Sequence, residues 1–204
     1  VALYSNGTQK VDTNSIIGTF NKGSAGGTVT LFTSAASSAS GSTINHRNNN
    51  FSNITLTGAT IIAGWSNTGT GNPTQTVTGN IFRNWTTGAS AVTGMTINGF
   101  GGTTSTVTSN ILTKITGQAA ITALNIGANG TATTLNVNSN IIDTVRSTGT
   151  GGTVIGLASS NVSSTVNLNA NQIDSLSSTG TTATVVGINV TAGTVVTITN
   201  NTVQ

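Results

Sequence analysis

The sequence predicts an all-β fold: a single-stranded parallel β-solenoid, or β-helix, with about 30 residues per coil, three short strands per coil and about six to seven coils. Asparagine recurs at nearly one period, in steps of 31, 30, 30, 31 and 30 residues, at Asn49, Asn80, Asn110, Asn140, Asn171 and Asn201. Between these asparagines, short β-branched segments alternate with Gly, Ser, Thr and Asn, as strands alternate with turns. Helical periodicity is not sustained anywhere.

Three apolar columns define the three strands of a coil. The first strand follows the asparagine as N-x-φ-x-x-φ, where φ is apolar, with the pairs Phe51/Ile54, Phe82/Trp85, Leu112/Ile115, Ile142/Val145 and Ile173/Leu176. The second reads φ-x-x-φ-x-φ, at Ile62/Trp65/Asn67, Val92/Met95/Ile97, Ile121/Leu124/Ile126, Val154/Leu157/Ser159 and Val185/Ile188/Val190. The third holds one apolar residue three positions before the next asparagine, at Val77, Val107, Val137, Leu168 and Ile198. In these columns Trp65 and Trp85 are expected to fill the core.

The first coil obeys the same pattern with looser spacing. Val11 precedes Asn14 by three residues, Val29/Phe32/Ser34 matches the second column, and Thr43-Ile44-Asn45 resembles the third strand. The step from Asn14 to Asn49 is 35 residues, so we expect an extra loop around Ser34–Ser42. Residues 1–204 are therefore interpreted as one solenoid domain.

In a solenoid each coil stacks on the last at about 4.8 Å, so a column in the sequence becomes a row in space. The asparagine column then forms a structural amide ladder, in which each side chain bonds its neighbours above and below. The alternative is that asparagine merely tolerates the left-handed conformation at a turn. Both interpretations place it at the same corner of the coil.

Charge and cysteine are scarce. Only 4% of residues are charged and the net charge is +3, from lysines and arginines spread along the chain. Nucleic-acid binding needs clustered cations, so no such partner is expected. The absence of cysteine excludes disulfides and thiolate metal sites. No unbroken apolar run exceeds the four residues of Val1–Tyr4, which predicts no membrane insertion.

The repeat unit N-x-I-x-x-L-S-S-T-G…V-x-G-I-x-V…G-T-x-V-x-I-x-N, best seen at 171–201, resembles the right-handed parallel β-helix repeats of secreted and surface proteins from Bacteroidetes-type bacteria. The resemblance implies an adhesin-like or fibrous exoprotein located outside the cell or on its surface. The same fold hosts pectate lyases and polygalacturonases, so the fold alone does not select a function.

Asp143 and Asp174 differ by one coil and share the fourth position of the repeat. Their α-carbons should lie about 5 Å apart, a separation that suits either a retaining glycosidase pair or a weak divalent-metal site. The same column holds Ser52, Arg83 and Thr113, which favours two solvated carboxylates and neither catalysis nor a cofactor. Both aspartates open D-[ST]-φ tripeptides, similar to the O-glycosylation motif of Bacteroidetes, which marks Thr144 and Ser175; the repeat alone could also create this coincidence.

The third strand is flanked by polar pairs, which alternation places outward: Thr76/Thr78, Thr106/Thr108, Asn136/Asn138, Asn167/Asn169 and Thr197/Thr199. A Thr-x-Thr array resembles the ice-binding face of insect-type antifreeze solenoids. Its interruption by asparagine favours a plain stacked ladder.

The chain starts and stops in mid-coil without caps, since Val1-Ala2-Leu3-Tyr4 resembles a second strand and 201–204 enters a first strand. Uncapped coils expose β-edges, so either the chain is a segment of a longer array or the end of one subunit continues into the next. We therefore expect an extracellular structural or adhesive β-helix that associates with itself head to tail in a filament, with glycan or surface contacts on its sides. The alternatives are a carbohydrate-active enzyme (lyase- or hydrolase-like) fragment and an ice-binding solenoid.

Overall fold

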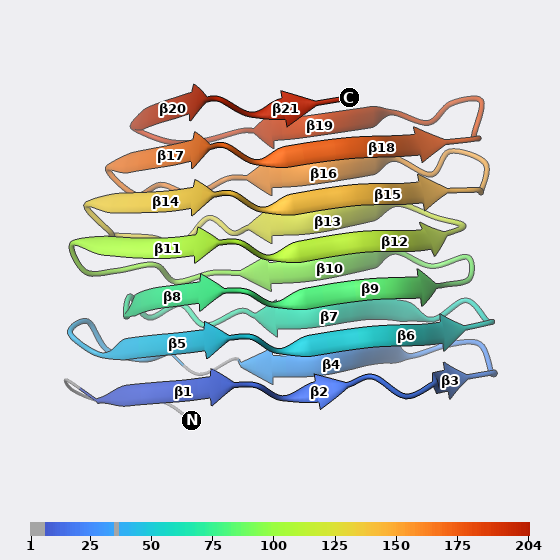
Figure 1. Ribbon diagram of the computed structural model, residues 1–204, viewed down its shortest axis with the longest axis horizontal. Coiled ribbons are helices and arrows are strands. Elements are labelled where there is room, and N and C mark those ends of the chain that lie inside the picture. The colour runs from blue at the N-terminus through green and yellow to red at the C-terminus, as the bar shows by residue number, and fades with distance from the viewer. Residues whose placement is uncertain (1–6, 35–36) are drawn as a thin grey trace.

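The computed structural model describes residues 7–34 and 37–204, and these residues form a parallel β-solenoid without a helix (Figure 1). From Asn49 onward, successive coils are offset by 30 or 31 residues. The predicted all-β, parallel, three-strand coil is therefore confirmed.

The described residues form three parallel sheets. The seven-stranded sheet contains β1 (Thr8–Asp12), β5 (Thr43–Arg47), β8 (Thr74–Thr78), β11 (Thr104–Thr108), β14 (Thr134–Asn138), β17 (Thr165–Asn169) and β20 (Val195–Thr199). The eight-stranded sheet contains β2 (Ser15–Ile16), β6 (Asn50–Leu56), β9 (Ile81–Thr86), β12 (Ile111–Gly117), β15 (Ile141–Ser147), β18 (Gln172–Ser178) and β21 (Thr202–Val203), with β3 (Phe20–Lys22) also paired to β6. The six-stranded sheet contains β4 (Thr28–Ser34), β7 (Ile61–Asn67), β10 (Val92–Ile97), β13 (Ile121–Ile126), β16 (Val154–Ser159) and β19 (Val185–Val190).

The sheets are arranged as a flattened coil. In Figure 1 the seven-stranded and eight-stranded sheets lie side by side at the front, and the six-stranded sheet lies behind with its arrows reversed. The apolar residues of all three sheets point into the space between these layers and form one core cluster. The outer faces carry mostly polar residues, as strand alternation allows, with a few exposed apolar side chains such as Ile61 and Ile141.

The apolar columns of the sequence are rows in the core. Ile115 pairs with Val145, and Val145 pairs with Leu176. Ile115 and Val145 are fully buried, and Leu176 is half-buried against the core. Their outward neighbours form a parallel, half-exposed row of Thr113, Asp143 and Asp174. Both tryptophans are buried in the core, as expected.

A left-handed residue in the middle of each first strand explains the N-x-φ-x-x-φ spacing. Two outward residues separate the two inward ones, which a regular strand with a period of two does not allow. The second outward residue has a positive φ in every coil, at Asn53 (63°), Asn84 (59°), Lys114 (55°), Thr144 (53°) and Ser175 (52°). This local reversal returns the next residue to the core.

The first coil departs from the sequence prediction in two ways. Thr43-Ile44-Asn45 does lie in the third strand, β5, but the column residue there is His46, which pairs with Val77, and the match to Ile44 is wrong by two positions. Only part of the extra length lies in the loop expected around 34–42. Ser34 and Thr43 are 9 residues apart where their partners Asn67 and Thr74 are 7 apart. The other extra residues lie between β2 and β3 and between β3 and β4. The strand expected at 1–4 lies outside the described residues.

Candidate functional site

The asparagine ladder lies at the corner where the seven-stranded sheet passes into the eight-stranded sheet. At Asn110, Oδ1 accepts from the backbone N–H of Asn80 at 3.1 Å and from its Nδ2 at 2.9 Å. The Nδ2 of Asn110 donates to Oδ1 of Asn140 at 2.9 Å and to the carbonyl of Val77 at 3.1 Å. Each carboxamide thus makes four hydrogen bonds, which join three consecutive coils.

The same arrangement repeats along the solenoid. Oδ1-to-Nδ2 contacts of 2.8 to 3.0 Å link Asn14, Asn49, Asn80, Asn110, Asn140, Asn171 and Asn201 in order. The five inner asparagines are fully or almost fully buried. Because a buried polar group without a partner is costly, this row of satisfied amides stabilises a corner that would otherwise bury unpaired backbone groups.

The left-handed conformation at this corner belongs to the residue before each asparagine. Those residues have φ values between 54° and 66° and are Thr13, Asn48, Gly79, Ser109, Ser139, Ala170 and Asn200. The asparagine column is thus defined by its side-chain hydrogen bonds, and the turn is made by its variable neighbour.

Asp143 and Asp174 are adjacent on the outer face of the eight-stranded sheet, as register partners on β15 and β18. Each accepts a hydrogen bond from the hydroxyl that follows it: Thr144 Oγ1 lies 3.0 Å from Asp143 Oδ1, and Ser175 Oγ lies 3.2 Å from Asp174 Oδ1. Thr144 and Ser175 are exposed. The geometry brings two carboxylates and two accessible hydroxyls to one edge of the solenoid.

The described residues hold no group of three or more His, Cys, Asp or Glu side chains placed to share a metal ion, and they form no cleft. The aspartate pair therefore lies on an open outer face. The described part of the chain also holds no helix that is long and apolar enough to cross a membrane.

The outer face of the seven-stranded sheet carries three polar rows. One was not recognised in the sequence: the strands begin with threonine in six successive coils, at Thr8, Thr43, Thr74, Thr104, Thr134 and Thr165, and these residues pair in register. The other two rows contain the Thr and Asn pairs found in the sequence. Asparagines bond along them, with Asn167 Nδ2 donating to Asn136 Oδ1 at 2.9 Å.

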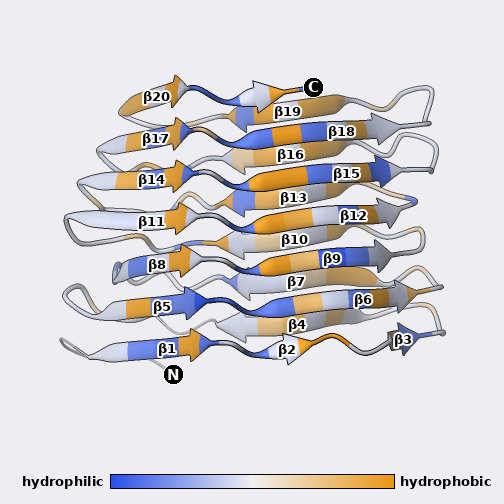
Figure 2. Ribbon diagram, in the orientation of Figure 1, coloured by the Kyte–Doolittle hydropathy of each residue, from blue (hydrophilic) through white to orange (hydrophobic). Residues whose placement is uncertain are grey.

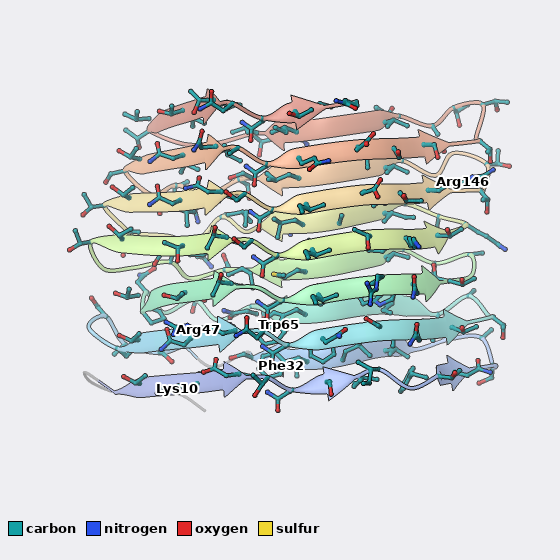
Figure 3. The ribbon with its side chains drawn as sticks, in the orientation of Figure 1. Lys10, Phe32, Arg47, Trp65 and Arg146 are labelled. Carbon is teal, nitrogen blue, oxygen red and sulfur yellow. The ribbon has the colours of Figure 1, made fainter. Side chains whose placement is uncertain are left out.

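His46 occupies an inward position between Val11 and Val77 and is completely buried. Its ring lies 4.7 Å from that of Trp65 and 5.8 Å from that of Phe32, measured between centroids. Figure 3 shows Phe32 and Trp65 close together beside β4 and β5. Neither ring nitrogen of His46 has a hydrogen-bond partner among the described residues. Burial lowers the pKa of His46 from 6.5 to about 4, so the imidazole is neutral at physiological pH.

The comparisons with known proteins add no name to this fold. No protein-family model, no curated protein and no solved structure matches the chain. The parallel β-solenoid therefore stands on the geometry described above.

Two features of the surfaces escaped the sequence reasoning. The threonine row could have been found by aligning strand starts, because the five threonines from Thr43 to Thr165 recur at the coil period. The buried histidine could have been found by counting three residues back from Asn49.

Proposed function

We propose that this chain is an extracellular structural protein with adhesive side faces, and that its solenoids assemble end to end into a filament. The support comes from the last described coil, formed by β19, β20 and β21. Its apolar residues Val185, Ile198 and Val203 are 45%, 51% and 55% exposed, whereas their partners one coil earlier are completely buried. A further coil seated in the same register would remove this apolar surface from water.

The asparagine ladder supports the same end-to-end arrangement because its hydrogen bonds all run in one direction along the solenoid. Each Oδ1 accepts from the preceding asparagine, so Asn14 has an open Oδ1 and Asn201 has an open backbone N–H among the described residues. A second copy that placed its Asn14 above Asn201 would continue the ladder. Such a contact is heterologous, does not close on itself and propagates as a filament.

The test is assembly of the purified chain. We expect light scattering to rise with protein concentration, and electron microscopy to show unbranched fibres one solenoid wide. Asn14→Ala should raise the critical concentration, because the added coil would lose its ladder acceptor. Asn125→Ala is the matched control, since Asn125 faces outward on β13 and makes only one long contact, of 3.5 Å, to Thr96. A chain that stays monomeric at millimolar concentration, or an equal effect of the two variants, would contradict end-to-end assembly.

The adhesive part of the proposal rests on the repeated outer rows. Hydroxyls and amides recur at about the interstrand spacing of 4.8 Å along the seven-stranded sheet, which offers many weak, identical contacts to a glycan or another repetitive surface. The extracellular part is checked by protease treatment of intact cells that express the protein: we expect cleavage without lysis, and full protection would contradict it.

The threonine rows also favour ice binding as a second candidate function. The strands β8 and β11 each present Thr-x-Thr-x-Thr on one flat outer face, at Thr74/Thr76/Thr78 and Thr104/Thr106/Thr108. A solution of the protein would then show thermal hysteresis that Thr106→Lys abolishes. Hysteresis no greater than that of an unrelated protein at equal concentration would remove this candidate.

The alternative of a carbohydrate-active enzyme can be tested at the aspartate pair. If Asp143 and Asp174 act on a glycan, cleavage of acidic or neutral polysaccharides must disappear in Asp143→Asn. We expect the unmodified chain to cleave no polysaccharide. Among the described residues, the two carboxylates contact only the neighbouring hydroxyls and no cationic side chain. Turnover that this substitution abolishes would replace our proposal.

A further inference from the structure

Charge is confined to one outer face over most of the solenoid. After Arg47, every charged residue lies on β9, β12, β15 or β18 of the eight-stranded sheet, namely Arg83, Lys114, Asp143, Arg146 and Asp174. All five are exposed or half-exposed. In Figure 2 the blue segments of β9, β15 and β18 lie on the front layer, and Figure 3 places Arg146 near the end of β15. The other two sheets carry no charge over the same coils.

These charges have no intramolecular ion-pair partners among the described residues. Among the described residues, the two aspartates accept only the neighbouring hydroxyls of Thr144 and Ser175, and the three cations make no hydrogen bond or ion pair. Asp143 and Asp174 also lie one strand apart, where like charges repel. The cationic strands β9 and β12 and the aspartate-bearing strands β15 and β18 therefore lie on one face, and their charges have no ion-pair partner among the described residues.

The order of the residues makes this face self-complementary. One row runs Ser52, Arg83, Thr113, Asp143, Asp174 along the solenoid axis. A second row, two residues earlier in each strand, runs Asn50, Ile81, Ile111, Ile141, Gln172. Ile141 is 36% exposed. When the rows are reversed about a line midway between β12 and β15, Arg83 meets Asp174 in the first row and Ile111 meets Ile141 in the second. The remaining pairs, Thr113 with Asp143 and Ile81 with Gln172, oppose no like charges.

We propose that this face binds a second copy of the chain in an antiparallel, two-fold symmetric dimer, with the axis between β12 and β15 and parallel to the strands. In that arrangement Arg83 opposes Asp174 of the second copy, twice by symmetry. Ile111 opposes Ile141 of the second copy, and Lys114 lies beside its Asp143. The interface is isologous and closed. It uses the side of the solenoid, so it does not depend on end-to-end assembly.

The charges exclude the neighbouring arrangements. Parallel side-by-side packing would set Arg83 against Arg83 and each aspartate against itself. An antiparallel axis through β12 would pair Arg83 with Asp143 but would oppose Lys114 with its own copy. An axis through β15 would oppose Asp143 and Arg146 each with its own copy. An axis between β15 and β18 would oppose the two aspartates. Among these arrangements, only the axis between β12 and β15 brings Arg83 opposite an aspartate without directly opposing like charges, and like charges across an interface disfavour the others.

The size of the face indicates a weak dimer. A seven-residue strand is about 23 Å long and five strand spacings cover about 24 Å, so the flat area is on the order of 550 Å² per copy. That falls at the low end for specific interfaces, where contacts are transient. Exposed ion pairs are also weakened by salt. The equilibrium must therefore be followed over protein concentration and ionic strength.

A charge swap tests the arrangement. Sedimentation equilibrium of the unmodified chain should show a monomer–dimer equilibrium that weakens at high salt. R83D and D174R should each raise the dissociation constant about tenfold, because both symmetric pairs become repulsive. The double variant R83D/D174R should return it to within about threefold of the original. K10D, which makes the same change in net charge on β1, should leave it unchanged. A monomer at every concentration, or a double variant no better than the singles, would overturn the proposal.

A second measurement reads the orientation directly. The chain has no cysteine, so T55C and T116C each carry one spin-label site, both on the same outward row of the face. The antiparallel dimer places paired labels about 24 Å apart along the axis at position 55 and about 5 Å apart at position 116. Parallel packing would give the same separation at both positions, and that result would disprove the arrangement even if a dimer forms.

Discussion

At the scale of single residues, the asparagine ladder concentrates more hydrogen bonds than any other side-chain row in the described coils. Asn110→Leu would keep the volume roughly constant but would remove the acceptor of two Asn80 hydrogens, on the backbone N and on Nδ2, and the Nδ2 donor to the carbonyl of Val77. The other Nδ2 hydrogen of Asn80 still bonds the carbonyl of His46. Each buried unsatisfied group costs about 1–3 kcal/mol, so we expect the free energy of unfolding to fall by about 3–5 kcal/mol. Chemical denaturation followed by circular dichroism measures the loss, and Asn125→Ala should change it by less than about 0.5 kcal/mol.

His46 gives the solenoid a pH dependence. Its pKa is about 4 in the folded chain and about 6.5 when unfolded, so between these values only the unfolded chain binds the proton. The stability that comes from keeping His46 neutral is therefore fully present above pH 6.5. The free energy of unfolding should fall by about 3 kcal/mol as the pH drops to 4. His46→Val, which continues the row of Val11 and Val77, should remove this fall. Thermal melting from pH 7 to 4 compares the two, and parallel curves would show that His46 is not responsible.

At the scale of the strand, a row of small residues lets the six-stranded sheet approach the eight-stranded sheet. Gly64, Gly94, Ala123 and Gly156 occupy equivalent inward positions on β7, β10, β13 and β16. A Cβ built on Gly94 would lie 2.5 Å from the carbonyl oxygen of Ala123 and 2.8 Å from Leu112 Cδ2. Both distances are shorter than van der Waals contact, so a larger residue requires the strands to separate.

Gly94→Val should therefore destabilise the fold by about 1–3 kcal/mol through overpacking, despite the higher strand propensity of valine. The control is Thr93→Val on the same strand, whose side chain points outward and is half-exposed. We expect that control to be neutral or slightly stabilising in the same denaturation measurement. Equal effects at the two positions would show that propensity, not the close approach of the sheets, governs this strand.

At the scale of the whole molecule, stability should vary along the axis, because each coil contacts only its neighbours. The inner strands β9, β12 and β15 have partners on both sides, whereas β20 and β21 lie on the exposed last coil. Amide hydrogen exchange should be slowest in the former and fastest in the latter. In filaments, protection of β20 and β21 should rise toward that of β15. Uniform exchange in the unassembled chain would contradict this stacking model.

The sequence alone determined the solenoid, its period and the identity of its core rows, because a repeated coil turns a one-dimensional spacing into a stack and each repeat reports independently on the same geometry. It also located the asparagine corner and the adjacent aspartates. It placed the third strand of the first coil at the right segment but took Ile44 for its column residue, since Ile44 is apolar and His46 is not, and both are buried on the same strand.

Only the tertiary structure decided how these residues are used. It assigned the left-handed turn to the residue before each asparagine. The sequence did not indicate this turn, because that position holds Thr, Asn, Gly, Ser or Ala in different coils. It also showed that all charges beyond Arg47 share one outer face. Those residues occupy different positions of the repeat, and only the arrangement of strands shows that these positions face the same way.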